Sequence, residues 1–304
     1  MNIILSNPRG FCAGVVRAID IVELTLKKYG SPVYVKHEIV HNPKVVKEVE
    51  EKGAITVENV EEIPNNSVVI FSAHGSNPKD FSKAKEKNLL VIDATCPLVT
   101  KVHNEAKKYS NDGKKIILVG HRGHQEVKGT MGQTSMTLID EREKWTLDNI
   151  KPDEEVAVLT QTTLSVKDTS KAVNQIKRKF PNALVRNDIC YATTNRQDAV
   201  KELALKTDLV LVIGSQNSSN CKRLQEVSES LGTPSFLIMN PEEILPEWIE
   251  GEKTIGITSG ASTPEGMVQK VVQFLNPSNL TSIDGTPENI TFKLPKELEK
   301  EKKS

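Results

Sequence analysis

The chain has 304 residues, of which 37% are hydrophobic, 26% are charged and 4% are aromatic. Lysine plus arginine and aspartate plus glutamate both number 40, so the formal net charge is zero. These values argue against nucleic acid or an anionic membrane as partner, because both attract positively charged surfaces and single strands stack on aromatic rings. The length exceeds what one compact core usually contains and predicts several domains.

The N-terminal sequence gives no sign of export. It reads Met-Asn-Ile-Ile-Leu-Ser-Asn-Pro, without the basic region and the long apolar run of a signal peptide. No apolar stretch approaches the roughly 20 residues that cross a bilayer. We therefore expect a cytoplasmic protein, in which the four cysteines are buried, metal-bound or reactive rather than paired in disulfides.

Short β-branched runs alternate with helical patterns along the whole chain. The predicted strands are 2–5, 33–36, 67–71, 89–92, 115–119, 156–159, 209–213, 235–238 and 254–257. The predicted helices include 15–28, 43–52, 98–111, 166–179, 194–206 and 221–231. This alternation predicts an α/β fold of strand–helix–strand units, with parallel sheets covered by helices.

Polar residues follow nearly every predicted strand. The segments after the strands are 6–14, 72–76, 93–97, 120–126, 160–163, 214–220 and 258–262, and they are rich in Cys, His, Ser, Thr and Asn. Ligands of parallel α/β sheets bind beyond the carboxyl ends of the strands. The pattern therefore predicts one functional site built from many strand ends.

Three cysteines lie in predicted strand-to-helix turns and are almost evenly spaced: Cys12, Cys96 and Cys190. A thiolate in such a turn can face a helix N-terminus, which favours the charged form. The spacing indicates three related lobes with one cysteine each, whereas Cys221 lacks this turn and is interpreted as a non-ligand. Three thiolates from separate lobes suit zinc with an open position or a [4Fe–4S] cluster with one iron lacking a protein ligand. The spacing leaves both open.

Three histidines stand in loops: His41, His74 and His124. Their ring N–H groups can donate to phosphate oxygens. His37, at a strand end, and His103, on a helix, are interpreted as structural. Glu126 follows His124 in a glycine-containing turn, where a solvated carboxylate is the simpler reading. Enclosed beside a metal, its pKa would rise and it could deliver protons.

Three hydroxyl-rich segments, 160–163, 215–220 and 258–262, have the composition of anion cradles. Small hydroxyls and the N–H groups of a helix start can surround a phosphate, although Ser and Thr there also serve as ordinary helix caps. The sequence contains neither the Gly-x-Gly-x-x-Gly of dinucleotide sites nor a P-loop.

These motifs closely resemble those of the LytB/IspH family, the 4-hydroxy-3-methylbut-2-enyl diphosphate reductases, over nearly the whole chain. The matching segments are PRGFCAGV (8–15), HEIVHN (37–42), SAHG (72–75), DATCP (93–97), GHQE (123–126), TQTTLS (160–165), DICYATTNRQ (188–197), GSQNSSN (214–220) and GAS (260–262).

The resemblance implies a trefoil of three similar α/β lobes, each with a small, mainly parallel sheet, around a central iron–sulfur site. We expect residues 14–96 to form the first lobe, 97–186 the second, and 1–13 with 187–275 the third. Residues 276–304 are expected to form a C-terminal extension with a charged tail.

The resemblance also implies a reaction and its site. A small allylic diphosphate loses its hydroxyl by reduction and gives isopentenyl and dimethylallyl diphosphates, the last step of the methylerythritol phosphate route. One [4Fe–4S] cluster with an open apical iron is held by Cys12, Cys96 and Cys190. Electrons come from an external donor such as ferredoxin or flavodoxin with its reductase. Glu126 matches the proton source. The matching substrate-binding residues are His41, His74, His124, Thr162, Ser218, Ser219, Asn220 and Ser262.

The residues alone leave two alternatives: a zinc hydrolase, and a non-catalytic sensor of a phosphorylated metabolite. Oxygen-free protein is colourless with zinc and brown with an iron–sulfur cluster, and a sensor shows no turnover.

Overall fold

A computed structural model describes residues 1–251 and 253–303. It contains one five-stranded sheet and two four-stranded sheets, and every strand pair in them is parallel. This confirms the predicted α/β fold with three small parallel sheets. The chain forms two compact units: the first comprises Met1–Val16, His41–Val45 and Cys190–Thr291, and the second comprises Arg17–Val40, Val46–Ile189 and Phe292–Ser304.

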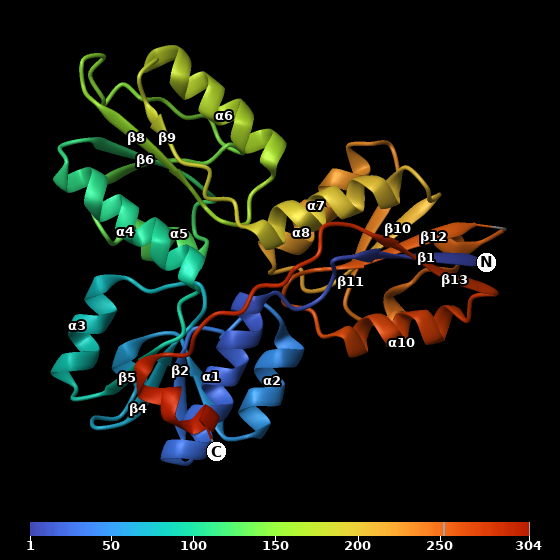
Figure 1. Cartoon of the computed structure of the whole chain (residues 1–304), viewed down its shortest axis with the longest axis horizontal. Coiled ribbons are helices and arrows are strands. Elements are labelled where there is room, and N and C mark those ends of the chain that lie inside the picture. The colour runs from blue at the N-terminus through green and yellow to red at the C-terminus, as the bar shows by residue number, and fades with distance from the viewer. Residues whose placement is uncertain (252, 304) are drawn as a thin grey trace. The chain divides into compact units, whose positions relative to one another are not determined.

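The first unit is built on the five-stranded sheet, in the order β11-β10-β12-β1-β13. Figure 1 shows β1 lying between β12 and β13. The strands are β1 (Asn2–Asn7), β10 (Leu209–Ile213), β11 (Ser235–Ile238), β12 (Thr254–Ser259) and β13 (Asn279–Asp284). The helices are α7 (Tyr191–Ala204), α8 (Ser219–Glu229), the short α9 (Pro246–Ile249) and α10 (Glu265–Leu275), with a 3-10 turn, η2, at Pro241–Glu243.

The continuous apolar sequence of β10 is explained by helices on both faces of this sheet. Leu211 and its alternate neighbours pack with Val268 and Val271 of α10. Val210 and Val212 pack on the other face with residues of α7 and α8. A strand buried on both faces needs apolar residues at every position, so it shows no alternation with polar ones.

The second unit contains the two four-stranded sheets, β3-β2-β4-β5 and β7-β6-β8-β9. Their strands are β2 (Val33–Lys36), β3 (Ala54–Val57), β4 (Val68–Phe71), β5 (Leu90–Asp93), β6 (Lys115–Val119), β7 (Met136–Ile139), β8 (Val156–Thr160) and β9 (Leu184–Val185). The α-helices are α3 (Pro78–Glu86), α4 (Pro97–Asn111), α5 (Gln125–Met131) and α6 (Val166–Lys179), together with most of α1 (Ala13–Tyr29) and α2 (Pro43–Glu51). Two 3-10 helices, η1 (Val60–Glu62) and η3 (Lys296–Lys303), complete it.

Every predicted strand is present, with its ends shifted by at most two residues. The sequence analysis did not predict β3, β7, β9 and β13. The residues of β13 are almost all exposed, and its sequence, Asn-Leu-Thr-Ser-Ile-Asp, has no apolar run. It is held as an edge strand by pairing with β1, which local sequence does not reveal. Among the helices that the structure describes, none is long and apolar enough to cross a membrane.

Candidate functional site

In the first unit, Cys12 directly precedes α1, and its turn is tied to the loop after β12. The Cys12 N–H donates to the Ala261 carbonyl at 3.1 Å. Two residues earlier, the Gly10 N–H donates to Ser259 Oγ at 2.9 Å. The backbone that carries this thiol is therefore fixed by the ends of two adjacent strands, β1 and β12.

Cys190 occupies the N-cap position of α7 in the same unit. Its sulfur lies 3.2 Å from Thr193 Oγ1. The next residue, Tyr191, accepts a hydrogen bond at its hydroxyl from the Ala13 N–H at 3.3 Å. Burial raises the pKa of Tyr191 to about 12, and the nearby Cys12 thiolate acts in the same direction. The turns that carry Cys12 and Cys190 are thus neighbours.

A buried arginine joins these two turns, and the sequence analysis did not single it out. Arg196, on α7, is 0% exposed. Its guanidinium donates to the Gly10 carbonyl at 2.8 Å, to the Ala192 carbonyl at 2.9 Å and to Glu288 at 2.9 Å. The sequence offers one signal for Arg196: it follows Cys190 by six residues and lies in the predicted helix 194–206. Glu288 lies too far along the chain to suggest the ion pair.

The first turn of α8 carries Ser218, Ser219 and Asn220. Ser218 is the N-cap, and its hydroxyl accepts from the Cys221 N–H at 3.4 Å. Asn220 is only 4% exposed, and neither its Nδ2 nor its Oδ1 has a hydrogen-bond partner among the described residues. A buried amide without partners is costly and suits a position that binds a polar ligand.

Ser262 and His41 meet beside this turn. The Ser262 hydroxyl donates to the His41 carbonyl at 3.1 Å. The loop of Ser262 passes close to α8, because a Cβ placed on Gly260 would lie 3.6 Å from Asn220 Nδ2. The first unit therefore gathers His41, Ser262 and the α8 residues at the carboxyl ends of β10 and β12.

Cys221 lies beneath this group and is 0% exposed. Burial raises the pKa of its thiol, which favours the neutral form. A methyl group on either Gly214 or Gly260 would overlap its sulfur. The Cys221 side chain therefore fills the space between two loops, which is a packing position.

In the second unit, Cys96 is the N-cap of α4 and is followed by Pro97. The Cys96 N–H donates to the Ala73 carbonyl at 3.0 Å, which joins the ends of β4 and β5. None of the four cysteines, all of which lie in the described part of the chain, forms a disulfide, and among them only Cys221 is fully buried. Three partly exposed thiols, each directly before a helix, suit a soft metal ion or an iron–sulfur cluster.

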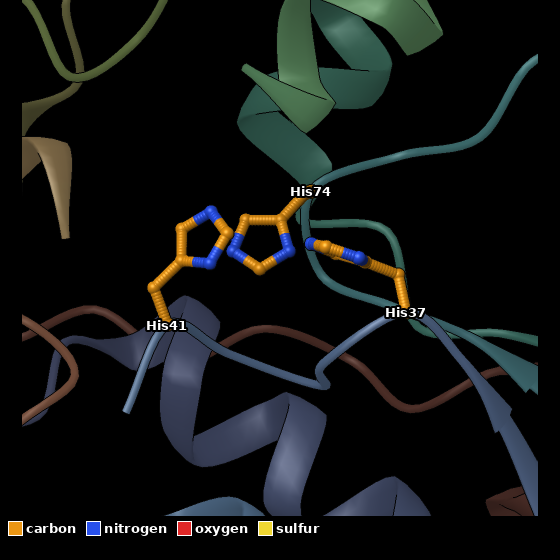
Figure 2. A group of neighbouring side chains, drawn as sticks. All are labelled: His37, His41 and His74. Carbon is orange, nitrogen blue, oxygen red and sulfur yellow. The ribbon is translucent and has the colours of Figure 1, made fainter. Parts of the chain in front are cut away.

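His74 follows β4 in a tight turn, and two further histidines of the second unit surround it. Its ring centroid lies 5.7 Å from that of His37 and 6.3 Å from that of His124. Figure 2 shows the rings of His37 and His74 at the ends of neighbouring strands, β2 and β4. The Nδ1 atom of His37 lies 3.0 Å from Glu58 Oε2. The sequence analysis interpreted His37 as structural, but the structure places it in this histidine group.

Helix α5 approaches the His74 turn without intervening side chains. A Cβ on Gly129 would lie 3.1 Å from the Gly75 backbone. His124 is the N-cap of α5, and its Nδ1 accepts from the Glu126 N–H at 3.2 Å. Because Nδ1 accepts, the proton of neutral His124 is on Nε2.

Glu126 is the buried acid of this group, and Thr162 holds both of its carboxyl oxygens. Glu126 is 3% exposed. Its Oε1 accepts from the Thr162 N–H at 2.7 Å, and its Oε2 accepts from Thr162 Oγ1 at 2.9 Å. Burial raises the pKa of Glu126 to about 7, against the opposing effect of the two Thr162 hydrogen bonds. The carboxyl is therefore poised to exchange a proton at neutral pH.

The sequence-predicted residues thus form two groups, each within one unit. Cys12, Cys190 and two of the hydroxyl-rich segments, 215–220 and 258–262, are in the first unit. The second unit brings together His74, His124, Glu126 and Thr162, with Cys96 one hydrogen bond from the His74 turn. One group has the composition of an anion site, and the other that of an acid–base site.

Comparisons with known proteins identify the family of this chain. The family model described as LytB protein matches residues 3–276. The chain is 51% identical to the 4-hydroxy-3-methylbut-2-enyl diphosphate reductase of Glaesserella parasuis serovar 5 (strain SH0165) over 308 aligned positions, 98% of each chain. It is 50% identical to the enzyme of the same name from Actinobacillus pleuropneumoniae serotype 3 (strain JL03), with 98% of each chain covered.

Solved structures give the same result. The structure of the E-1-hydroxy-2-methyl-but-2-enyl-4-diphosphate reductase from Plasmodium falciparum matches with a TM-score of 0.93 and 39% identity, covering 99% of this chain and 98% of that one. A second structure, of an (E)-4-hydroxy-3-methyl-but-2-enyl diphosphate reductase described as the terminal enzyme of the non-mevalonate pathway, matches with a TM-score of 0.66 and 34% identity, covering 91% of this chain and 99% of that one. The chain therefore belongs to the LytB/IspH family, the family of 4-hydroxy-3-methylbut-2-enyl diphosphate reductases.

Proposed function

We propose that this chain reduces 4-hydroxy-3-methylbut-2-enyl diphosphate to isopentenyl and dimethylallyl diphosphates, the terminal step of the non-mevalonate isoprenoid pathway. Two electrons and two protons enter, the allylic C–O bond breaks, and the hydroxyl leaves as water. Beyond family membership, the observation that carries this proposal is the enclosed Glu126 carboxyl, whose pKa of about 7 suits proton delivery.

The family generally uses an iron–sulfur cluster, and we assign one [4Fe–4S] cluster to Cys12, Cys96 and Cys190. When bound, the cluster supplies the electrons and an iron without a protein ligand that polarises the substrate's C–O bond. The position of each of these cysteines directly before a helix supports this ligand set. Cys221 is excluded, because its buried neutral thiol packs against Gly214 and Gly260.

The diphosphate is assigned to the first turn of α8 and its neighbours. Ser218, Ser219 and Asn220 offer hydroxyls, an amide and the N–H groups of a helix start, which together favour an anion. Asn220 Nδ2 gains the partner that it lacks among the described residues. Ser262 and the imidazoles of His41, His74 and His124 complete the proposed set of donors.

Glu126 is assigned as the acid that gives a proton to the leaving hydroxyl. Because burial raises the pKa of Glu126 to about 7, its carboxyl is protonated in roughly half of the molecules at neutral pH. The N–H and hydroxyl of Thr162 hold both carboxyl oxygens in place, so the acid is oriented before substrate arrives. The same Thr162 hydroxyl is assigned to contact the oxygen of the substrate's hydroxyl group.

The electrons are assigned to an external donor of the ferredoxin or flavodoxin type, together with its reductase. We place the reaction in the cytoplasm, where disulfides rarely persist, because none of the four cysteines in the described chain forms a disulfide.

The proposal is tested with protein purified without oxygen. We expect brown protein that contains iron and sulfide and that oxidises reduced methyl viologen only when the substrate is added. Colourless protein that contains zinc and releases phosphate would show a hydrolase instead, and brown protein that binds the substrate without turnover would show a sensor.

A further inference from the structure

An open cavity of about 740 Å³ lies along α4 in the second unit. Its lining includes Thr95 and Pro97, the residues on either side of Cys96. It is separate from the histidine group and from Glu126, none of which line it. None of the substrate-binding residues assigned above lines the cavity either, so its role is not explained by the diphosphate.

The charged residues of the cavity are mainly basic. Four cations, Arg17, Lys101, Lys108 and Arg186, line it with two carboxylates, Asp93 and Glu105. Glu105 is already paired with Arg186 at 2.9 Å.

The acidic lining residues leave the cations only partly compensated. Lys108 makes no ion pair within the described residues, and its ammonium lies 5.8 Å from the Tyr109 ring centroid. Lys101 lies 3.4 Å from Asp188 and 3.9 Å from Glu105. The side chains of Lys101 and Arg186 nevertheless remain 46% and 39% exposed. The rim is therefore a local positive patch on a chain of zero net charge.

Arg17 connects this patch to Cys96. Its guanidinium donates to the Ala94 carbonyl at 3.2 Å and to the Thr95 carbonyl at 3.1 Å, so it holds the backbone that enters Cys96. Burial lowers the pKa of Arg17, while Asp93 and Cys96 act in the opposite direction. The cavity wall is thus one residue from a proposed cluster ligand.

We infer that this cavity and its basic rim dock the external electron donor, an acidic one-electron carrier protein. The inference rests on the proposed function, which requires such a donor. A reduced carrier that docks here would supply one electron close to Cys96, a residue assigned to hold the cluster, and would leave oxidised, so one product requires two docking events. Positive charges around the contact steer an acidic partner and fix its orientation.

The test uses Lys108→Glu, because Lys108 is on the rim and its removal breaks no ion pair within the described chain. The matched control is Lys177→Glu, which makes the same charge change in the last turn of another helix, α6, outside the cavity. Binding of oxidised flavodoxin to the holoprotein is measured by calorimetry at low salt, and kcat/KM is measured with reduced flavodoxin as the varied substrate.

We expect Lys108→Glu to weaken flavodoxin binding and lower kcat/KM by roughly tenfold, with a weaker dependence on salt than the wild type. Lys177→Glu should behave as the wild type does. With reduced methyl viologen, which needs no docking surface, both variants should turn over at the wild-type rate.

Equal binding of flavodoxin by the two variants would overturn the docking inference. Competition of inorganic diphosphate with flavodoxin for the Lys108-dependent site, with saturation at micromolar concentration, would also overturn it by showing a small-anion site. Failure of the wild type to turn over with methyl viologen would contradict the proposed function alone, because docking is read from binding.

Discussion

At the scale of single residues, the central feature is a carboxyl group that burial alone would keep neutral. Glu126 is enclosed, yet both of its oxygens accept hydrogen bonds from Thr162. Burial favours the protonated form and the hydrogen bonds favour the charged form, and the resulting pKa is about 7. The balance yields an acid that can give up its proton near physiological pH.

Glu126→Gln should keep the fold and the cluster but lose the proton. Glutamine has nearly the same shape, and its carbonyl can still accept from the Thr162 N–H, while the Thr162 hydroxyl oxygen can accept from the new amide once its own proton turns away. We expect turnover with methyl viologen to fall by a factor on the order of 100 or more. The iron content should be unchanged. Glu143→Gln, at a half-exposed side chain, is the control; turnover of Glu126→Gln close to that control would remove Glu126 from its role.

The pH dependence of turnover follows from the same pKa. In its proposed role Glu126 acts in its protonated form, and the folded-state pKa of this carboxyl is raised from 4.5 to about 7. The active form is therefore complete well below pH 7 and is lost as pH rises through that value. With methyl viologen as donor, the rate should fall about tenfold per pH unit above the pKa. A rate that stays flat from slightly acid to clearly alkaline pH would contradict this assignment.

At the scale of elements, the starts of helices carry most of the chemistry. Cys12, Cys96 and Cys190 directly precede α1, α4 and α7, and Ser218 caps α8. Each helix start presents unpaired N–H groups and the positive end of the helix dipole, which stabilise thiolates and phosphates. The parallel sheets explain why such starts recur, because most of the strands are followed by a turn into a helix.

Cys221 packs against the loops that contain Gly214 and Gly260. This packing gives a prediction in which a second substitution restores what the first one impairs. Alanine at Gly260 puts a methyl group onto the Cys221 sulfur, while the other atoms near that methyl are at 3.6 Å. Gly260→Ala should raise the KM for the diphosphate substrate, because the loop beside Asn220 must shift. Adding Cys221→Ala removes the sulfur and frees that space.

The double variant Gly260→Ala/Cys221→Ala should therefore recover most of the substrate affinity, and Cys221→Ala alone should retain its iron. A double variant no better than Gly260→Ala would show that the overlap with sulfur is not the cause.

The Arg196–Glu288 pair gives a second prediction at this scale. Arg196 holds the Gly10 and Ala192 carbonyls, which belong to the turns of Cys12 and Cys190. Arg196→Met removes these bonds and leaves the largely buried Glu288 without its partner, at a cost of about 3 kcal/mol. We expect a lower unfolding temperature and less iron and sulfide per chain.

The matched control is Arg178→Met, at an exposed position of α6. Arg196→Lys should restore part of the iron content, since lysine keeps the charge but cannot bond three partners in the same geometry. Full iron content and an unchanged unfolding temperature in Arg196→Met would refute this role.

At the scale of the whole molecule, the sequence predicts the strands and helices better than it predicts the long-range contacts that support them. Apolar runs such as β10 and β6 are buried on both faces, so their sequences identify them as strands. The ends of these strands carry the polar residues that form the two groups described above. Strand β13 escapes prediction, because its residues are exposed and only its pairing with β1 defines it.

Some site residues also escape prediction, for a related reason. His37 resembles an ordinary strand-end residue, and its place beside His74 depends on the pairing of β2 with β4. Arg196 depends on Glu288, which is distant in sequence. Local patterns report which residues are buried or capped, whereas these contacts arise from chain pairing over long distances.

The most direct measurement of the proposed reaction is its electron count. Oxygen-free holoprotein is mixed with the substrate and a known amount of reduced methyl viologen, and the products and the oxidised dye are quantified together. The proposed function predicts two dye molecules oxidised for each molecule of isopentenyl or dimethylallyl diphosphate formed, with no release of phosphate. Dye oxidation without these products, or phosphate release without dye oxidation, would contradict it.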